Sequence, residues 1–434
     1  DPVPADSWSG VRDANKSGDV CAQKDSYSHQ VIGSDDCLYL NIYTNKLNCD
    51  IPRAVLFWIH GGGFAYGHGN DYKLGPDYLV KKDVILVTFN YRLNIFGFLN
   101  LDDEESPGNQ GLKDQVMALK WVKQNIANFG GDPNLVTIFG ESAGSSSVHY
   151  LTLTPLAKGL FQRAIMQSGV ATNPWAYTSL SMKEEAEKIA DNKLGKKTSD
   201  TKELIEFLQT IEAHDLIDAV QSFVNQTNRY VNVNRFVPSV DSKSKTPFLS
   251  IPIVVQAQSG IKVPHIIGYN SDEAIILLAG LQEVDYSEIN TNEDMLLPSN
   301  EKKFLQARNV SVSDVKKFFM GDKEISQKND QLFLNLASAS SFDINIHDIV
   351  AIQAKLSGIP TYFYKFDHYS KETAVVQQLV GTDLEGTSLT EDLYYFWYQK
   401  VLDDRKIKQP TSFPIEHLIQ QRFFELWINF AKTG

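Results

Sequence analysis

The sequence contains few cysteines and no long apolar run. Its 434 residues include only three cysteines, Cys21, Cys37 and Cys49. Three cysteines are too few for a disulfide scaffold, and no two of them have the spacing of a metal site, so we expect no bound metal. No apolar run reaches the roughly eighteen residues of a membrane-spanning helix, and the longest candidates, such as residues 54–59, have the length of a strand. The sequence therefore predicts no membrane span.

Positive charge is scarce relative to negative charge. The chain has 41 Lys and Arg against 53 Asp and Glu, and its formal net charge of -12 is spread along the sequence. This balance disfavours nucleic acid and anionic membranes as partners and favours an uncharged or cationic ligand. The composition, with 42% hydrophobic and 11% aromatic residues, is typical of a globular protein with a large core. We expect one domain spanning residues 1–434, because large α/β enzymes often exceed the usual domain length.

No signal peptide is visible at the start of the sequence. The first residues, DPVPADSWSGVRDA, read like the middle of a loop, which is compatible with a processed N-terminus. Three N-glycosylation sequons, at Asn15, Asn225 and Asn309, would suit a secreted glycoprotein, although about this many arise by chance in a chain of this composition. These features favour a secreted location and leave a cytoplasmic one open.

Short apolar strands alternate with amphipathic helices between Cys37 and Gly169, which is the pattern of a parallel sheet covered by helices. A helix is predicted over 111–129, where apolar residues recur at helical spacing before Gly130-Gly131. Charged helix-forming segments near 182–193, 201–221 and 312–319 predict a helical cap or insertions. The predicted strands are 38–44, 54–60, 84–91, 134–140, 163–169, 263–270 and 360–368. The fold class is therefore α/β, with a mainly parallel central sheet flanked by helices.

The strongest single motif is Gly140-Glu141-Ser142-Ala143-Gly144, a G-x-S-x-G between a predicted strand and the small-residue start of a helix. A nucleophile elbow needs small residues on both sides of the serine, because the chain must turn sharply and hold the hydroxyl clear of the sheet. The hydroxyl then lies near amide groups at a helix N-terminus. An ordinary glycine-rich turn is the alternative, but the strand before and the helix after favour the elbow.

A second motif, His60-Gly61-Gly62-Gly63-Phe64, directly follows a predicted strand. Consecutive glycines let backbone N–H groups approach and stabilise a tetrahedral oxyanion, where one lost donor typically costs about 3 kcal/mol. A phosphate-binding loop is the rival interpretation, but no G-K-[ST] follows the glycines. We interpret His60 as an anchor of this loop rather than as a catalytic base.

These motifs are joined by further stretches that read SDDCLYLNIYT, FWIHGGGF, FNYRLNIFGFL, GNQGLKDQVMALKWVKQNIANFGGDP, FGESAGSSSVH and LFQRAIMQSG. In this order and wording they resemble the type-B carboxylesterase and cholinesterase-like family of α/β-hydrolases, and insect-type carboxylesterases in particular. The resemblance is strongest in 37–177, thin in 180–255 and recognisable again in 264–434. Family members usually extend beyond both ends, so the resemblance implies a chain that lacks N- and C-terminal family segments.

The resemblance implies a role for each matching residue of the two motifs. Ser142 matches the family nucleophile, and Gly62, Gly63 and Ala143 match the residues whose N–H groups form the oxyanion hole. No cofactor is implied. The family's triad acid is a glutamate in a stretch after a strand, and IIGYNSDEA puts Glu273 at that position. The Ser, acid, His chain order of α/β-hydrolases is respected up to this point.

The triad base is where this sequence departs from the family. The gapless alignment of 386–396 with the family's histidine segment sets Leu389 at the histidine position. Leucine can neither accept a proton from Ser142 nor bridge Ser142 to Glu273. Asp272, next to Glu273, is the weaker candidate for the triad acid. Removing the base of a serine triad can reduce turnover by roughly 10⁶. We therefore expect impaired turnover.

Another of the nine histidines could substitute for the missing base if its ring came within about 3 Å of the serine oxygen, directly or through a water. His368 lies where relatives often carry a non-catalytic histidine. The remaining ones fall in segments that the fold places elsewhere or on helix faces: His29, His60, His68, His149, His214, His265, His347 and His417.

The resemblance also implies a disulfide and a ligand pocket. The family disulfide would join Cys21 to Cys37 across fifteen intervening residues, stabilise the fold by roughly 3 kcal/mol and leave Cys49 free. Residues 22–36 contain no tryptophan of the kind that binds choline in cholinesterases, so choline esters are improbable substrates.

Two residues are assigned to the substrate pocket. Glu141 precedes the nucleophile, and Trp175 matches the family's acyl-pocket tryptophan, although a large aromatic residue there could equally serve core packing.

Two hypotheses of function follow. The first is a carboxylesterase-family protein that binds or acts on small uncharged carboxylic esters or apolar ligands through Ser142. The second is a non-catalytic member that sequesters hydrophobic ligands or binds other proteins, since folds are shared by catalytic and non-catalytic proteins. Leu389 motivates the second hypothesis, whereas the retained elbow, glycine loop and Glu273 favour a pocket that still binds ligand.

Overall fold

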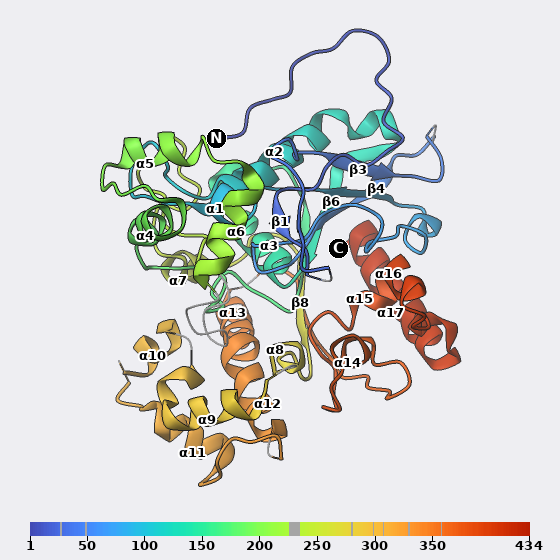
Figure 1. Ribbon diagram of the computed structural model, residues 1–434. Coiled ribbons are helices and arrows are strands. Elements are labelled where there is room, and N and C mark those ends of the chain that lie inside the picture. Colours follow the sequence, from blue (N-terminus) through green and yellow to red (C-terminus); the bar gives the residue numbers. More distant parts are fainter. Residues whose placement is uncertain are drawn as a thin grey trace.

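A computed structural model describes residues 1–26, 28–47, 50–224, 235–278, 281–297, 299–306, 308–328, 330–356 and 358–434 (Figure 1). A central sheet has the strand order β3-β5-β4-β6-β7-β8-β9, with β3 antiparallel to β5 and every other neighbouring pair parallel. The strands are β3 Leu40–Tyr43, β4 Arg53–Ile59, β5 Ile85–Phe89, β6 Gly131–Glu141, β7 Arg163–Gln167, β8 His265–Asn270 and β9 Thr361–Phe366. Each lies within or overlaps a predicted strand, so the mainly parallel sheet is confirmed.

The inner strands β4 and β5 are buried on both faces, and alternation along β4 divides its side chains between two cores. Val55, Phe57 and Ile59 belong to one apolar cluster, whereas Leu56 and Trp58 belong to the other. This is the period of two expected for a strand that is covered on both sides. Strand β6 begins at Gly131, earlier than predicted, and the register with β4 shifts near its start.

Helices cover the sheet on both faces (Figure 1). The predicted helix over 111–129 is α2 Gln110–Asn125 followed by a 3-10 turn that ends at Gly130. The segment predicted as one helix over 201–221 is two helices, and between them the N–H and the hydroxyl of Thr210 both donate to the Phe207 carbonyl. The other elements outside the sheet are β1 Gln23–Lys24, β2 Val31–Ile32, α1 Asn94–Phe98, α3 Ala143–Leu153, α4 Lys183–Leu194, α5 Thr201–Leu208, α6 Ala213–Val224, α7 Ile253–Gln256, α14 Val375–Val380, α15 Leu393–Phe396, α16 Lys400–Asp404 and α17 Pro414–Thr433.

A group of helices with its own apolar cluster lies beyond the end of β8, at the bottom of Figure 1. It contains the predicted insertion helix near 312–319, which the structure extends to Met320. The helices that contribute to this cluster are α8 Ile275–Leu278, α9 Glu283–Thr291, α10 Ser299–Gln306, α11 Val312–Met320 and α12 Asp330–Ser338. A π-helix over Ala339–Asp343 and α13 Ile344–Ala354 follow, and the buried Ile346 and Ile349 of α13 pack in the cluster that contains Val55.

The predicted disulfide between Cys21 and Cys37 is present, and both cysteines are buried. Cys49 and the sequon at Asn225 lie outside the described residues. Asn15 and Asn309 are exposed, which a sequon requires, and glycosylation stays a prediction. Within the described parts of the chain, no helix is both long and apolar enough to cross a membrane.

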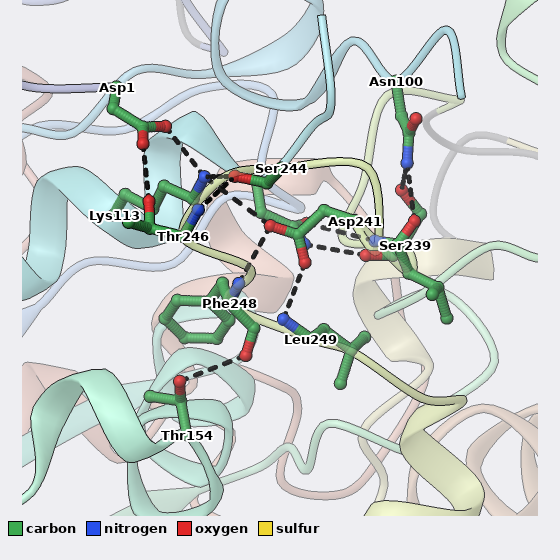
Figure 2. Close-up of polar contacts among 12 residues, drawn as sticks. Asp1, Asn100, Lys113, Thr154, Ser239, Asp241, Ser244, Thr246, Phe248 and Leu249 are labelled. Carbon is green, nitrogen blue, oxygen red and sulfur yellow. Dashed lines mark hydrogen bonds and ion pairs between the residues drawn. The ribbon is translucent and has the colours of Figure 1, made fainter. Parts of the chain in front are cut away.

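The segment that precedes α7 is held by a buried carboxylate, Asp241 (Figure 2). Its two oxygens accept hydrogen bonds from the backbone N–H groups of Phe248 at 2.9 Å and Leu249 at 2.7 Å. The ammonium of Lys113, from α2, lies 3.6 Å from the same carboxylate and donates to the Ser244 hydroxyl at 2.7 Å. One side chain thus closes the loop 241–249 and ties it to the helix that covers the sheet.

Burial outweighs attraction within this ion pair. Burial raises the pKa of Asp241 and lowers the pKa of Lys113, and in each case it is the largest influence. A buried pair of this kind adds little net stability. The Lys113 ammonium also has a second carboxylate partner, Asp1, at 2.7 Å.

We expect Asp241→Ala to lower the free energy of unfolding by about 2–4 kcal/mol, because the N–H groups of Phe248 and Leu249 lose their acceptor and the Lys113 ammonium keeps only Asp1 as a carboxylate partner. Urea denaturation followed by circular dichroism measures the change. Asp191→Ala, at an exposed position on α4, is the matched control and should cost less than about 0.5 kcal/mol. Equal stability of the two variants would contradict the role assigned to Asp241.

Candidate active site

Ser142 lies on a sharp turn between β6 and α3, in a backbone conformation with φ 56° and ψ -124° that non-glycine residues rarely adopt. Its N–H donates to the Gln167 carbonyl at 2.9 Å, and its carbonyl accepts the Ser146 N–H at 2.9 Å. The strained turn is therefore anchored on one side to β7 and on the other to the first turn of α3. The side chain is placed at the N-terminus of an eleven-residue helix, where the helix dipole favours negative charge.

The glycines of the motif are required by close packing. A Cβ on Gly144 would lie 2.0 Å from the Ile59 carbonyl oxygen, and a Cβ on Gly140 would lie 2.6 Å from the Gly144 carbonyl carbon. Gly169, which sequence reasoning did not single out, has the same property, since its Cβ would lie 2.6 Å from the Ser142 carbonyl oxygen. The turn has room for backbone only, as a nucleophile elbow requires.

The glycine loop packs directly against this turn. A Cβ on Gly61 would lie 2.7 Å from the Glu141 carbonyl oxygen and 3.2 Å from Ser142 Cβ. Gly62 has φ 107°, and a Cβ there would meet the Tyr66 carbonyl oxygen at 2.1 Å. Gly63 has φ 59°, and no atom lies within 4 Å of the position its Cβ would take. The loop therefore approaches the serine closely, and its assignment as an oxyanion hole stays a prediction.

His60 is held at the base of the loop. Its ring stacks on Tyr91 with centroids 4.3 Å apart, and the Tyr91 hydroxyl donates to the His60 carbonyl at 2.9 Å. Burial lowers the pKa of His60 to about 3, so the ring is neutral at physiological pH. These contacts are those of an anchor for the loop.

Glu273 follows β8 and is completely buried. Its Oε1 accepts the Asn270 N–H at 2.8 Å. Neither Oε2 nor the Ser168 hydroxyl makes a well-formed hydrogen bond, although the hydroxyl is close enough to oppose part of the rise in pKa that burial causes. Asp272, the weaker candidate for the acid, accepts the Thr387 N–H at 3.2 Å and so serves the neighbouring loop.

Leu389 lies beside Glu273. Its backbone N–H donates to the Glu273 carbonyl at 3.3 Å, and its side chain is buried. The next residue, Thr390, has φ 72°, which is unfavourable for a β-branched residue. The structure thus brings the aligned position and the aligned acid together at the same edge of the sheet.

Every histidine of the chain is described, and no hydrogen bond joins any of their rings to Ser142 or Glu273. Burial lowers the pKa of His149 to about 3, and its Nδ1 accepts the Ala171 N–H. Seven further rings have these hydrogen-bond partners: the Gly61 carbonyl for His60, the Asn70 N–H for His68, the Gly33 carbonyl for His214, the Val263 carbonyl for His265, Tyr269 for His347, Glu416 for His368 and Gln421 for His417.

Comparisons with known proteins agree with this geometry. The family model described as "Carboxylesterase family" matches residues 1–434. The chain belongs to the carboxylesterase family. It is 34% identical over 461 residues to juvenile hormone esterase of Tribolium castaneum, with 100% of this chain and 76% of that protein covered. It is 35% identical over 452 residues to a carboxylic ester hydrolase of Bombus ignitus, with 100% and 78% covered.

A solved structure shares the fold. The crystal structure of juvenile hormone esterase from Manduca sexta, with OTFP covalently attached, matches with a TM-score of 0.85 and 29% identity, covering 99% of this chain and 82% of that chain. Family membership and the α/β-hydrolase fold are therefore shown, and ester hydrolysis is supported at the level of the family.

This carboxylesterase-family chain has a buried polar cluster at the ends of β7 and β8 that sequence reasoning missed. Asp392 accepts the Gln167 side-chain amide at 2.7 Å and the Asn270 side-chain amide at 3.3 Å, so it links the ends of β7 and β8. Asn270 also donates to the Ser388 carbonyl at 2.8 Å. Burial, followed by the negative charge of Asp392, raises the pKa of Glu141 well above its usual range. The sequence signal that could have predicted this cluster is the presence of a polar residue, Gln167 or Asn270, at the end of each of two strands.

Trp175 is fixed by the π-helix between α12 and α13. Its indole N–H donates to the Ser341 carbonyl at 2.8 Å, and its ring lies 5.6 Å from that of Phe342. The last residue of this π-helix, Asp343, has one oxygen without a hydrogen-bond partner among the described residues. Burial raises the pKa of Asp343 to about 7, while Lys365 opposes the rise. Single π-helical turns of this kind are frequent at functional sites.

We expect Asp343→Asn to remove a pH dependence of stability. Because the folded pKa of about 7 exceeds the unfolded value near 3.9, this group favours the folded state only while protonated, and stability falls as pH rises from about 4 to 7. Asn mimics the protonated form, so the variant should match the parent at pH 4 and exceed it by on the order of 1–3 kcal/mol at pH 7.5. Urea unfolding across this range measures the difference, and the exposed Asp218→Asn is the control.

Proposed function

We propose that this carboxylesterase-family protein binds small uncharged carboxylic esters at Ser142 and turns them over slowly, because it lacks the triad base. The observation that carries the proposal is the 3.3 Å hydrogen bond from the Leu389 N–H to the Glu273 carbonyl. A histidine at position 389 would therefore have its backbone directly beside that of the triad acid. An aliphatic side chain there has no lone pair with which to accept a proton.

In the full reaction, the Ser142 hydroxyl attacks the ester carbonyl carbon while a base takes its proton, and the alkoxide leaves after receiving that proton. The N–H groups of Gly62, Gly63 and Ala143 would stabilise the oxyanion, each to the extent of about 3 kcal/mol. Glu273 would orient the base and stabilise its charged form. With leucine at 389, binding and oxyanion stabilisation remain, while proton transfer falls to water.

The buried state of Glu273 supports the same conclusion. Among the described residues, no histidine ring is hydrogen-bonded to its carboxylate, and burial raises the pKa of Glu273 well above the usual range. A carboxyl group in this state holds a proton more readily than a triad acid that pairs with an imidazolium. We also propose a secreted location, supported by the Cys21–Cys37 disulfide, since such bonds persist in oxidising compartments.

We expect Leu389→His to raise hydrolysis of p-nitrophenyl acetate by at least about 10³-fold over the unaltered chain, because it restores a proton acceptor beside Glu273. Steady-state release of nitrophenolate measures the gain. Leu384→His is the matched control, since both leucines are equally buried, and it should give no gain. Glu273→Gln added to Leu389→His should cost most of the restored activity.

Hydrolysis of p-nitrophenyl acetate at ordinary esterase rates by the unaltered chain would contradict the proposal that its turnover is impaired. A Leu389→His variant that folds and binds ester but stays as slow as the Leu384→His control would contradict the alignment of position 389.

A non-catalytic ligand-binding role is the second candidate, favoured by the same leucine. The two candidates differ in the reactivity of Ser142. We expect diethyl p-nitrophenyl phosphate to label the unaltered chain once, over hours: Ser142 Oγ bonds to phosphorus, the bond to nitrophenolate breaks, and the hydroxyl proton goes to water.

Intact mass spectrometry measures this labelling. Ser142→Ala should abolish it, and Leu389→His should accelerate it. Absence of labelling in an intact, folded chain would favour pure sequestration over slow esterase chemistry.

A further inference from the structure

A cavity of about 410 Å³ opens between the loop after α1, the segment 177–182 and the segment that leads into α7. Its volume is within the range of small-molecule sites. None of the residues assigned above to the nucleophile, the oxyanion hole or the triad lines it. The cavity is therefore distinct from the candidate active site around Ser142.

Polar contacts, some of them buried, hold the walls of this cavity (Figure 2). The Asn100 side-chain amide donates to the Ser239 hydroxyl at 2.9 Å and to the Val240 carbonyl at 2.8 Å. The Ser239 carbonyl accepts the Asn109 side-chain amide at 2.7 Å. Leu249, a further lining residue, is fixed by Asp241 through its backbone N–H. The cavity is thus pre-formed, which lowers the cost of ordering on binding.

The lining is apolar with a few hydroxyl groups. Met182, Leu249 and Ile253 supply buried apolar surface, and Val240 is partly buried. Apolar side chains also continue outside the cavity, because four of its lining or neighbouring residues are exposed: Leu180, Ile251, Val254 and Val255. An apolar floor that extends into an exposed apolar rim suits the hydrocarbon part of an amphiphile.

The charged side chains at the mouth of the cavity are acidic. Asp102 is the charged residue among those lining the cavity, and Asp103, Glu104 and Glu105 follow it in the loop. No ion pair is recorded for these four side chains in the described chain. Lys183, next to the lining residue Met182, is engaged with Thr201 and Glu187 instead. A cationic group at the mouth would therefore be attracted by this negative charge.

We propose that this cavity is a second ligand site that takes an amphiphile with an apolar body and a protonated amine head group. The apolar body occupies the space between Val240, Leu249 and Ile253, and the amine lies toward Asp102. The site does not depend on the chemistry of Ser142. It adjoins the segment that carries Trp175, since Tyr177 lines the cavity while Trp175 bonds to the π-helix.

The test uses octylamine on the full chain at pH 7, with octanoate and octanol as probes of the same length, and isothermal titration calorimetry as the readout. We expect octylamine to bind at least tenfold more tightly than octanoate, with octanol in between. Octanoate binding as tightly as octylamine would overturn the cationic assignment, and no binding of any probe would overturn the site.

Two exposed variants locate the binding. Leu180→Lys puts a cation at the mouth and should weaken octylamine at least tenfold, whereas Leu418→Lys, the same change at an exposed leucine of α17, should leave binding unchanged. Asp102→Asn should weaken octylamine about three- to fivefold without changing octanol. Asn suits this position, where φ is 54°, because it tolerates the left-handed region.

Thermal unfolding confirms that each variant is folded. Unchanged octylamine affinity in a folded Leu180→Lys variant would put the binding elsewhere and overturn the proposal.

Discussion

The architecture around Ser142 depends on one close approach between backbones. The carbonyl oxygen of Ile59, at the end of β4, occupies the place that a Cβ at Gly144 would need. The parallel pairing of β4 with β6 sets Ile59 opposite Gly140, so the strand ends, the turn and the helix meet with no side chain between them. The glycine loop leaves β4 at that same point and therefore runs alongside the serine. Strain at Ser142 persists because this packing over-determines its conformation.

A second constraint acts on the other side of the serine, where side chains rather than backbones make the connection. Asp392 accepts amides from the ends of β7 and β8 and so fixes the loop that contains Leu389. The same neighbourhood buries Glu141, Glu273 and Asp392, and burial raises the pKa of all three carboxyl groups. Several acids without a nearby cation are expensive to ionise together. Such a site would stabilise the imidazolium of a triad histidine, and on our proposal this chain lacks that histidine.

Much of the sheet could be predicted because strands buried on both faces have a strong local signature. The apolar runs that became β4, β5 and β6 were recognisable without any tertiary information. The break between α5 and α6 was not, because no glycine or proline marks it in the sequence. The π-helix over Ala339–Asp343 and its contact with Trp175 also escaped prediction, because they join segments far apart in the sequence.

The sequence by itself determined the family, the order of the strands along the chain, the elbow at Ser142, the glycine loop and the disulfide pairing that the resemblance implied. These features are encoded in short, contiguous motifs. Only the tertiary structure decided that the backbone of Leu389 bonds to that of Glu273, that Asp392 bridges two strands, and that Asp241 closes the wall of a separate cavity. Each of these depends on chain segments that meet after folding, and burial, which sets their charges, exists only in the folded state.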